Sequence, residues 1–247
     1  MISSRGTFAS VSPTASSSAG DAAALSHGEL LRRKIALASG GMLAALDRYW
    51  SQPDIAERYP ELLFHIHCLV RATVPAMEAA RRKAEELAPS DPVARAVEAY
   101  LAHHIPEELH HDDWLLDDLE VLGVPRESVW RRVPSPGAAA LIGSVYYWVL
   151  HAHPVAWFAY AGVTEGHPPS AEFLLKFIED TGLPPDAFRT YLKHAQLDPH
   201  HSREMYEVLD ELPLTSEQTA LLGVVAFQTL HHVAALFEAL TAQPCTT

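Results

Sequence analysis

Apolar residues recur every three to four positions along almost the whole chain from Ser26 onward. This spacing places them on one face of an α-helix. No stretch alternates apolar and polar residues with the β-branched enrichment that is typical of strands. The pattern therefore predicts an all-α fold, a bundle of about seven helices that forms a single domain over residues 26–243.

Capping residues and helix breakers set the expected limits of these helices. Ser26 and Ser135 can each cap a helix, and Thr215 with Gln218 makes a capping box for the last one. The second helix is expected to break or kink at its internal prolines. The expected helices cover residues 26–50, 53–88, 90–122, 135–162 and 170–181, a segment from 184 or 185 onward, and 215–240, with a short element near 126–131.

Composition narrows the class of protein. Residues 1–25 are rich in Ser, Ala and Gly and lack the apolar core of a secretory signal, so we expect a disordered leader. The sequence contains no run of ~18–20 uninterrupted apolar residues, so we expect no membrane span. The net charge of −13, with 18 Lys and Arg and no basic run, argues against nucleic-acid binding. Cys68 and Cys245 make no disulfide framework, which fits a cytoplasmic location.

Two short stretches carry the same arrangement of histidine and carboxylate side chains. Each reads His-x3-acid-x2-His, so its residues stand at positions i, i+4 and i+7. At about 100° per residue, an α-helix projects these positions from one stripe of its surface. Imidazoles and a carboxylate on one stripe suit a first-row transition metal, and two facing stripes could hold two ions. The first trio is His104, Glu108 and His111, and the second trio is His194, Asp198 and His201.

The first trio offers two overlapping choices of ligand. Glu108 and His111 form the Glu-x-x-His element that di-metal bundles project into their cores, but Glu107 and His110 have the same spacing. Neighbouring apolar residues favour the first pair, because they lie near its stripe. We therefore predict Glu108 and His111 as ligands, with His104 as an optional further ligand or hydrogen-bond partner. The apolar residues are Tyr100, Leu101, Leu115 and Leu119.

Two prolines and one isolated acid leave alternatives open. Pro106 either kinks a continuous helix or begins a new one. Asp198 could likewise cap a new helix that begins at Pro199, although a continuous helix is the favoured interpretation. Glu165 is the single acid in the apolar stretch 137–166. It is either a solvated helix-end residue or a ligand, and beside the trios we interpret it as a ligand.

Three stretches in combination resemble the heme-oxygenase-like diiron oxidases and oxygenases. They are EELHHDDWLLDDLEVLG, the segment YAGVTEG and the H-x3-D-x2-H trio; FHIHCLVRATVPAMEAA is similar to that family's second helix. The resemblance covers about residues 55–240. It implies a seven-helix heme-oxygenase-like bundle that binds two iron ions (Fe2+) and uses O2 as co-substrate. Some members have a carboxylate where His104 stands. The implied ligands are Glu108, His111, Glu165, His194, Asp198 and His201.

The resemblance also implies a kind of chemistry. We expect an O2-activating oxidase or oxygenase that acts on a small amino acid, amine or carboxylic acid in a biosynthetic pathway, by N-oxygenation or oxidative C–C or C–N cleavage. Arg71 could bind a substrate carboxylate or form a structural ion pair. Tyr147 and Trp157 could line the pocket or pack in the core. The resemblance further allows an external electron donor and a homodimer.

Two other functions stay open at this point. One is a bundle that binds metal without acting on a substrate. The other is a metal-free member of the same fold, similar to thiaminases or cofactorless oxidases. The six matching ligand positions argue against the metal-free alternative.

Overall fold

The computed structural model describes residues 25–244, and the expected leader lies outside these residues except for Leu25. The described residues form helices and no strands, which confirms the all-α prediction. The helices are α1 His27–Ala38, α2 Gly40–Trp50, α3 Ile55–Leu87, α4 Pro92–Glu108, α5 His111–Val121, α6 Arg126–Arg131, α7 Pro136–His151, α8 Ala156–Thr164, α9 Ala171–Thr181, the 3-10 helix η1 Pro185–Phe188, α10 Arg189–Glu211 and α11 Ser216–Ala242.

The predicted capping residues begin their helices as expected. The Ser26 hydroxyl accepts a hydrogen bond from the amide of Glu29, and Ser135 does the same for Ala138. Thr215 and Gln218 form the reciprocal capping box at the start of α11. These side chains satisfy amide groups that have no partner inside the helix.

Three of the expected helices are divided in two, so the count of seven is wrong for the described residues. The stretch 26–50 divides at Ser39, where α1 ends and α2 begins. The hydroxyl of Ser39 donates a hydrogen bond to the carbonyl of Ala36. The stretch 135–162 divides between His151 and Ala156, where Pro154 follows the end of α7. The stretch 90–122 divides at Leu109 and His110. In contrast, α3 continues through Pro60 and Pro75 without a break.

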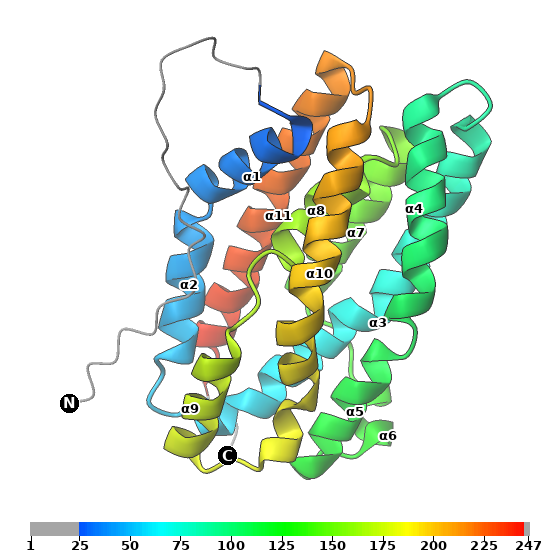
Figure 1. Ribbon diagram of the computed structural model, residues 1–247. Coiled ribbons are helices and arrows are strands. Elements are labelled where there is room, and N and C mark those ends of the chain that lie inside the picture. The colour runs from blue at the N-terminus through cyan, green and yellow to red at the C-terminus, as the bar shows by residue number, and fades with distance from the viewer. Residues whose placement is uncertain (1–24, 245–247) are drawn as a thin grey trace.

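The long helices α3, α4, α10 and α11 give the molecule its elongated shape, and the shorter ones pack around them (Figure 1). Helix α3 packs against α4, α5 and α7, and α11 packs against α1, α2, α7 and α8. Helix α10 contacts α4, α5 and α8. This arrangement matters for the site, because the predicted ligands stand on α4, α5, α8 and α10 or at their ends.

Helix α11 is long and apolar enough to cross a membrane by length and composition. In this fold it is a core helix instead. Leu222, Ala226, Leu230 and Leu236 are buried between the neighbouring helices, and 44% of its most apolar window is buried. Burial inside a bundle accounts for such a sequence without a bilayer.

Candidate metal centre

The six predicted ligands and His104 come from four elements that meet inside the bundle. Helix α4 carries His104 and Glu108, and α5 begins at His111. Helix α10 supplies the second trio, and Glu165 is the C-cap of α8. Five of the seven residues are fully buried; they are His104, Glu108, His111, Asp198 and His201.

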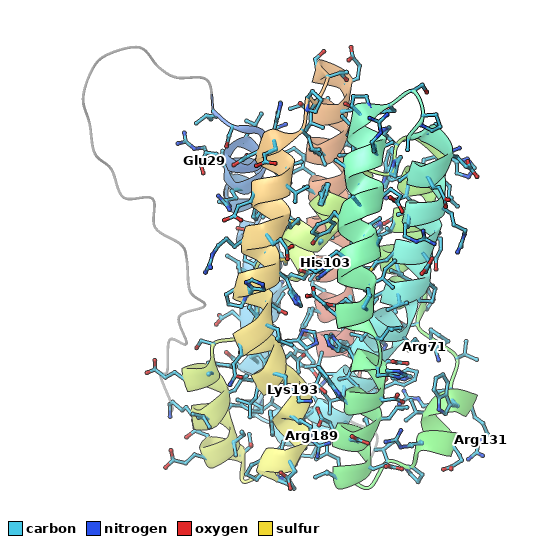
Figure 2. All side chains as sticks on the ribbon, turned by 45° about the vertical axis from the view of Figure 1, so that its right-hand side comes forward. Glu29, Arg71, His103, Arg131, Arg189 and Lys193 are labelled. Carbon is cyan, nitrogen blue, oxygen red and sulfur yellow. The ribbon has the colours of Figure 1, made fainter. Side chains whose placement is uncertain are left out.

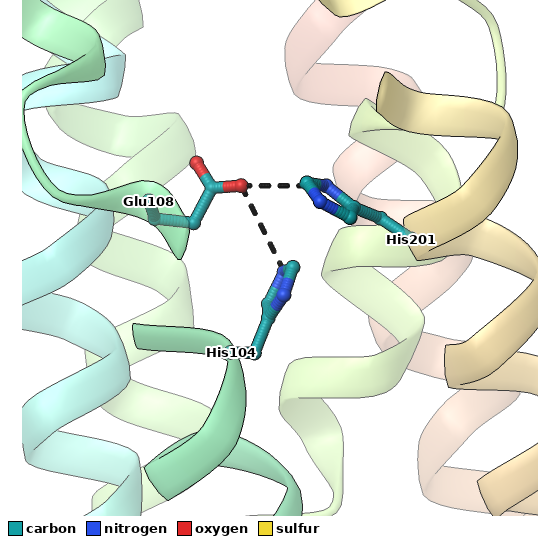
Figure 3. A group of neighbouring side chains, drawn as sticks. All are labelled: His104, Glu108 and His201. Carbon is teal, nitrogen blue, oxygen red and sulfur yellow. Dashed lines mark ion pairs between the residues drawn. The ribbon is translucent and has the colours of Figure 1, made fainter. Parts of the chain in front are cut away.

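Glu108 of the first trio contacts histidines of both trios. Its Oε1 lies 3.8 Å from Nε2 of His104 and 3.5 Å from Nδ1 of His201. Figure 3 marks these two ion pairs with dashed lines. Its Oε2 lies 3.0 Å from Nδ1 of His111, without the alignment of a hydrogen bond. One carboxylate therefore faces imidazoles from α4, α5 and α10. The ligand atoms of His104, Glu108 and His201 all lie within 4.8 Å of one another, close enough to share one ion.

The other half of the centre is built around His194. Its Nδ1 lies 2.9 Å from Oδ1 of Asp198, one turn along α10. The ring of His194 stands edge-on to that of His111, with centroids 5.0 Å apart. The indole of Trp114 stacks on the ring of His111, with centroids 4.0 Å apart, and its centroid lies 6.3 Å from that of His194. The two imidazoles are therefore held in fixed orientations by packing.

Five buried polar atoms in this region have no hydrogen-bond partner among the described residues. They are Nε2 of His104, Nδ1 of His111, Nε2 of His194, Nδ1 of His201 and Oε2 of Glu165. An unsatisfied buried polar group costs about 1–3 kcal/mol. Five of them would cost an amount comparable to the whole stability of a typical domain, about 5–15 kcal/mol. All five are good ligand atoms, so metal ions would satisfy them together.

The charges at the site also fit a bound cation. Burial, together with the negative charges of Glu108 and Asp198, raises the pKa of the Glu165 carboxyl well above its usual value. Glu165 also stands at the C-terminal end of α8, where the helix dipole disfavours a negative charge. Burial opposes ionisation of Glu108 too, but the neighbouring His111, His104 and His194 lower its pKa overall. A divalent ion among these carboxylates would remove their mutual repulsion.

The two prolines beside the ligands do not end their helices. Pro106 lies inside α4, and the chain breaks only after Glu108. At that break His110 has a left-handed backbone, with φ of +70°, and α5 begins at His111. The alternative that a helix begins at Pro106 is therefore wrong. Pro199 lies inside the continuous helix α10, which confirms the favoured interpretation of the second trio.

A cavity of about 220 Å³ borders one side of the centre. Glu108, Glu165, His194 and Asp198 form its polar end. Most of the remaining wall is apolar, and it contains no lysine or arginine among the described residues. The apolar wall includes Met42, Leu46, Trp50, Ile66, Leu69, Val70, Leu115, Leu141, Val163, Val233, Leu236 and Phe237.

The three residues predicted to bind substrate lie away from this cavity. Arg71 stands on α3 with its guanidinium 5.7 Å from the ring of Trp130, on the far side of α4 from α10 (Figure 2). Tyr147 is 59% exposed on the surface of α7, and Trp157 is buried in the core. None of the three lines the cavity. The aromatic and hydroxyl side chains that do line it include Tyr160, Thr164, Thr190 and Tyr191.

Sequence reasoning assigned no role to Glu107, which the structure places beside the first trio. Its Oε2 lies 3.0 Å from Nδ1 of His104 and 3.8 Å from Nε2 of His201. The available signal was its position three residues after His104, a spacing at which side chains meet on a helix. The choice between Glu107 and Glu108 as the inward residue hid this role of Glu107. In the structure both acids contact His104 and His201, each at a different nitrogen of the ring.

Comparisons with known proteins agree with this geometry. The sequence profile of a family described as an iron-containing redox enzyme matches residues 66–232. No curated protein matches the chain significantly. Among solved structures, a domain of unknown function with a heme oxygenase-like fold from Shewanella denitrificans OS217 has a TM-score of 0.67 and 20% identity, covering 86% of this chain and 88% of that one.

Two further solved structures have the same similarity. A CADD-like protein of unknown function from Nostoc punctiforme PCC 73102 has a TM-score of 0.67 at 18% identity, over 89% of this chain and 99% of that one. A TenA homolog from Pseudomonas syringae pv. tomato DC3000 has a TM-score of 0.66 at 15% identity, over 85% and 90%. At these identities the likeness shows the fold alone, and it confirms the predicted heme-oxygenase-like architecture.

Proposed function

Because the chain belongs to the iron-containing redox enzyme family, we propose that it is a non-heme diiron oxidase or oxygenase. Glu108, His111, Glu165, His194, Asp198 and His201 would hold two irons, with His104 as a seventh ligand. The observation that carries this proposal is the group of five buried ligand atoms without hydrogen-bond partners. Ferrous ions bound there would supply the electrons that reduce O2 to an oxidant.

The surrounding residues would prepare the site for such chemistry. Glu108 would help to hold the ions, since its two oxygens face different imidazoles. The apolar cavity keeps bulk water from the substrate, so that polar interactions inside it are stronger than in solvent. Glu165 opens directly to the cavity, and in the absence of a cation its raised pKa favours a proton on this carboxyl. Binding of metal would therefore release that proton.

The shape and polarity of the cavity support one kind of substrate within the predicted classes. A cavity of about 220 Å³ is larger than the ~150 Å³ apolar cavity that accepts benzene in an engineered protein. Its carboxylates gather at the metal end; the rest of the wall includes His167, whose pKa is lowered by burial, and no lysine or arginine of the described residues. A small carboxylic acid or amine with one polar head and an apolar body fits best, because a second charged group would be left unpaired.

Iron loading and oxygen use test this proposal directly. The full chain is loaded with Fe(II) without oxygen, its iron is counted, and it is mixed with O2 under stopped-flow absorbance. We expect about two irons per chain. Oxygen consumption should accelerate with short straight-chain carboxylic acids or amines and remain at background with small polar amino acids. Glu165→Gln should lower the iron content, while Glu172→Gln, at an exposed acid of α9, should leave it unchanged.

The same experiment separates the alternatives. Iron binding with an oxygen uptake that no added compound changes would indicate a metal-binding bundle without a substrate. Product formation that survives exhaustive chelation would indicate a metal-free enzyme of this fold. Either result contradicts the proposed function.

A further inference from the structure

Glu107 occupies the outer side of the two imidazoles that face Glu108. Its Oε2 lies 3.0 Å from Nδ1 of His104 and 3.8 Å from Nε2 of His201. The opposite nitrogens of the same rings, Nε2 of His104 and Nδ1 of His201, lie 3.8 and 3.5 Å from Oε1 of Glu108. Each imidazole therefore stands between two carboxylates, one on each of its nitrogens.

This arrangement determines where the ring protons belong. An ionised carboxylate only accepts hydrogen bonds, so the contact at 3.0 Å requires a proton on Nδ1 of His104. A neutral imidazole with that proton presents a lone pair at Nε2, on the side of Glu108. The contact of Glu107 with Nε2 of His201 is longer than a hydrogen bond, at 3.8 Å, but the negative charge there favours the proton on that nitrogen, which leaves the lone pair on Nδ1. Both lone pairs then converge with Glu108.

The burial of the partners distinguishes this contact from an ordinary surface ion pair. The side chains of His104 and His201 are 1% and 5% exposed, whereas that of Glu107 is 36% exposed. The inward nitrogens have no hydrogen-bond partner among the described residues, while the Nδ1 of His104 has Glu107. Glu107 therefore contacts the outward nitrogens of two buried imidazoles, while their inward nitrogens, which lack a hydrogen-bond partner among the described residues, can bind a ligand. Carboxylates in this position orient metal-binding histidines and fix their tautomers.

We propose that Glu107 is the positioning residue for one of the two metal ions, setting the tautomer and orientation of both His104 and His201. The inference rests on the proposed metal site, and it adds a residue that does not itself bind the ion. It also gives His104 a definite part, as a ligand through Nε2. Glu107 joins α4 to α10 by this contact, since His104 and His201 belong to different helices.

The first test needs no metal and examines the tautomers themselves. In protein labelled with 15N-histidine, long-range proton–nitrogen spectra distinguish the Nδ1–H and Nε2–H forms. We expect His104 as the Nδ1–H form and His201 as the Nε2–H form in the unsubstituted chain. Glu107→Ala should convert a substantial fraction of both rings to the other form. Glu107→Gln, whose amide oxygen can still accept one hydrogen bond, should retain the His104 form.

The second test measures binding of Co(II), titrated by its visible absorption without oxygen. Glu107→Ala should weaken one of the two binding steps by about 10–100-fold, and Glu107→Gln should recover part of that loss. Glu204→Gln is the matched control. The Glu204 carboxylate lies 3.8 Å from Nε2 of His103, on the outer surface where α4 meets α10 (Figure 2). Among the described ion pairs, none joins Glu204 to His104 or His201.

The outcomes separate this inference from the proposed function. Tautomers and Co(II) affinity that do not change in Glu107→Ala would overturn the role of Glu107 while the metal site stands. Equal effects of Glu107→Ala and Glu204→Gln would also overturn it, because they would indicate a general charge effect. An unsubstituted chain that binds no Co(II) would contradict the proposed function, and the tautomer measurement would still decide the orienting role.

Discussion

The two trios have the same spacing in sequence but stand on different backbones. The second trio lies on one continuous helix, α10, which passes through Pro199. The first trio is divided, because α4 ends at Glu108 and α5 begins at His111. The difference shows that spacing along a chain identifies candidate ligands without fixing how they converge.

The division changes which groups meet. On α10, His194 and Asp198 hydrogen-bond along one helix face, and His201 continues the stripe toward α4. At the break, the chain turns through His110 and continues as α5, so that His111 reaches Oε2 of Glu108 from the start of the next helix. Glu108 therefore lies at the end of its helix, where its two oxygens face opposite sides.

Hydrogen bonds also join α5 to the first turn of α10, away from the metal centre. Asp118 on α5 accepts a hydrogen bond from the amide of Thr190 at 2.9 Å, in the first turn of α10. The neighbouring Asp117 contacts Arg189 at 2.8 Å. Amides in the first turn of a helix have no partner within it, so Asp118 acts as a cap supplied from another helix. This contact sets where α10 begins relative to His111.

The largest effect is expected from removing the carboxylate at the division. Glu108→Ala should lower the iron content below that of any other single ligand variant, because Glu108 faces His111 of the first trio and His201 of the second. Asp198→Ala should have a smaller effect, since its described partner is His194 on its own helix. Iron per chain, measured after anaerobic loading and desalting, checks this order.

Matched controls exist on both helices. Glu207→Ala changes an exposed acid of α10 and Glu120→Ala an exposed acid of α5, so neither should alter iron content. If Asp198→Ala loses as much iron as Glu108→Ala, the two trios contribute equally. The special position of Glu108 at the helix end would then have no consequence for binding.

A smaller effect is expected at the contact that joins α5 to α10. Asp118→Ala leaves the buried amide of Thr190 without an acceptor, which should lower the free energy of unfolding by about 1–3 kcal/mol. Asp118→Asn retains an acceptor oxygen at the same place and should lose less. Chemical denaturation at pH 7 measures both variants. Equal losses in the two would show that the hydrogen bond contributes little.

The same residue gives a pH dependence with a definite sign. Burial raises the pKa of Asp118 above its usual value. For an acid whose pKa is raised in the folded state, the favourable contribution is present below the unfolded pKa of about 3.9 and is lost as the pH rises through the folded value. Asp118→Asn removes this titration. Its stability relative to the unsubstituted chain should therefore increase with pH from about 4 upward, and a flat difference would contradict the raised pKa.

The sequence predicted the helices, and which candidate ligands lie close together, better than it predicted their surroundings. Helical spacing was enough to select Glu108 over Glu107 for the inward stripe, because Leu115 and the other apolar neighbours are buried as expected. The cavity residues could not be chosen in this way. Every residue from Ala156 to Val163 is buried, so α8 has no polar face from which to read its orientation. Trp157 and Tyr160 look equivalent in sequence, yet only Tyr160 lines the cavity.

The break between the helices was also beyond sequence reasoning, for a different reason. Local signals for a helix end are glycine or asparagine in a left-handed conformation, and here a histidine takes that place. Histidine adopts this conformation less readily than glycine, so the residue type at this position did not signal the break. A glycine with positive φ does follow the end of the expected helix 90–122, at Gly123.

The smallest expected effect follows from the positive φ of His110. His110 is exposed, and its ring contacts Asp113 at 3.2 Å on the surface. His110→Gly should raise the free energy of unfolding by up to about 1 kcal/mol, because glycine adopts a positive φ without steric penalty. Iron content should stay the same. His110→Val should lower stability by about 1–2 kcal/mol and reduce iron binding, since a β-branched residue opposes the conformation that brings His111 to Glu108. Thermal unfolding with and without iron measures both variants. If valine were tolerated with full iron content, the left-handed residue would not be what joins the two halves of the first trio.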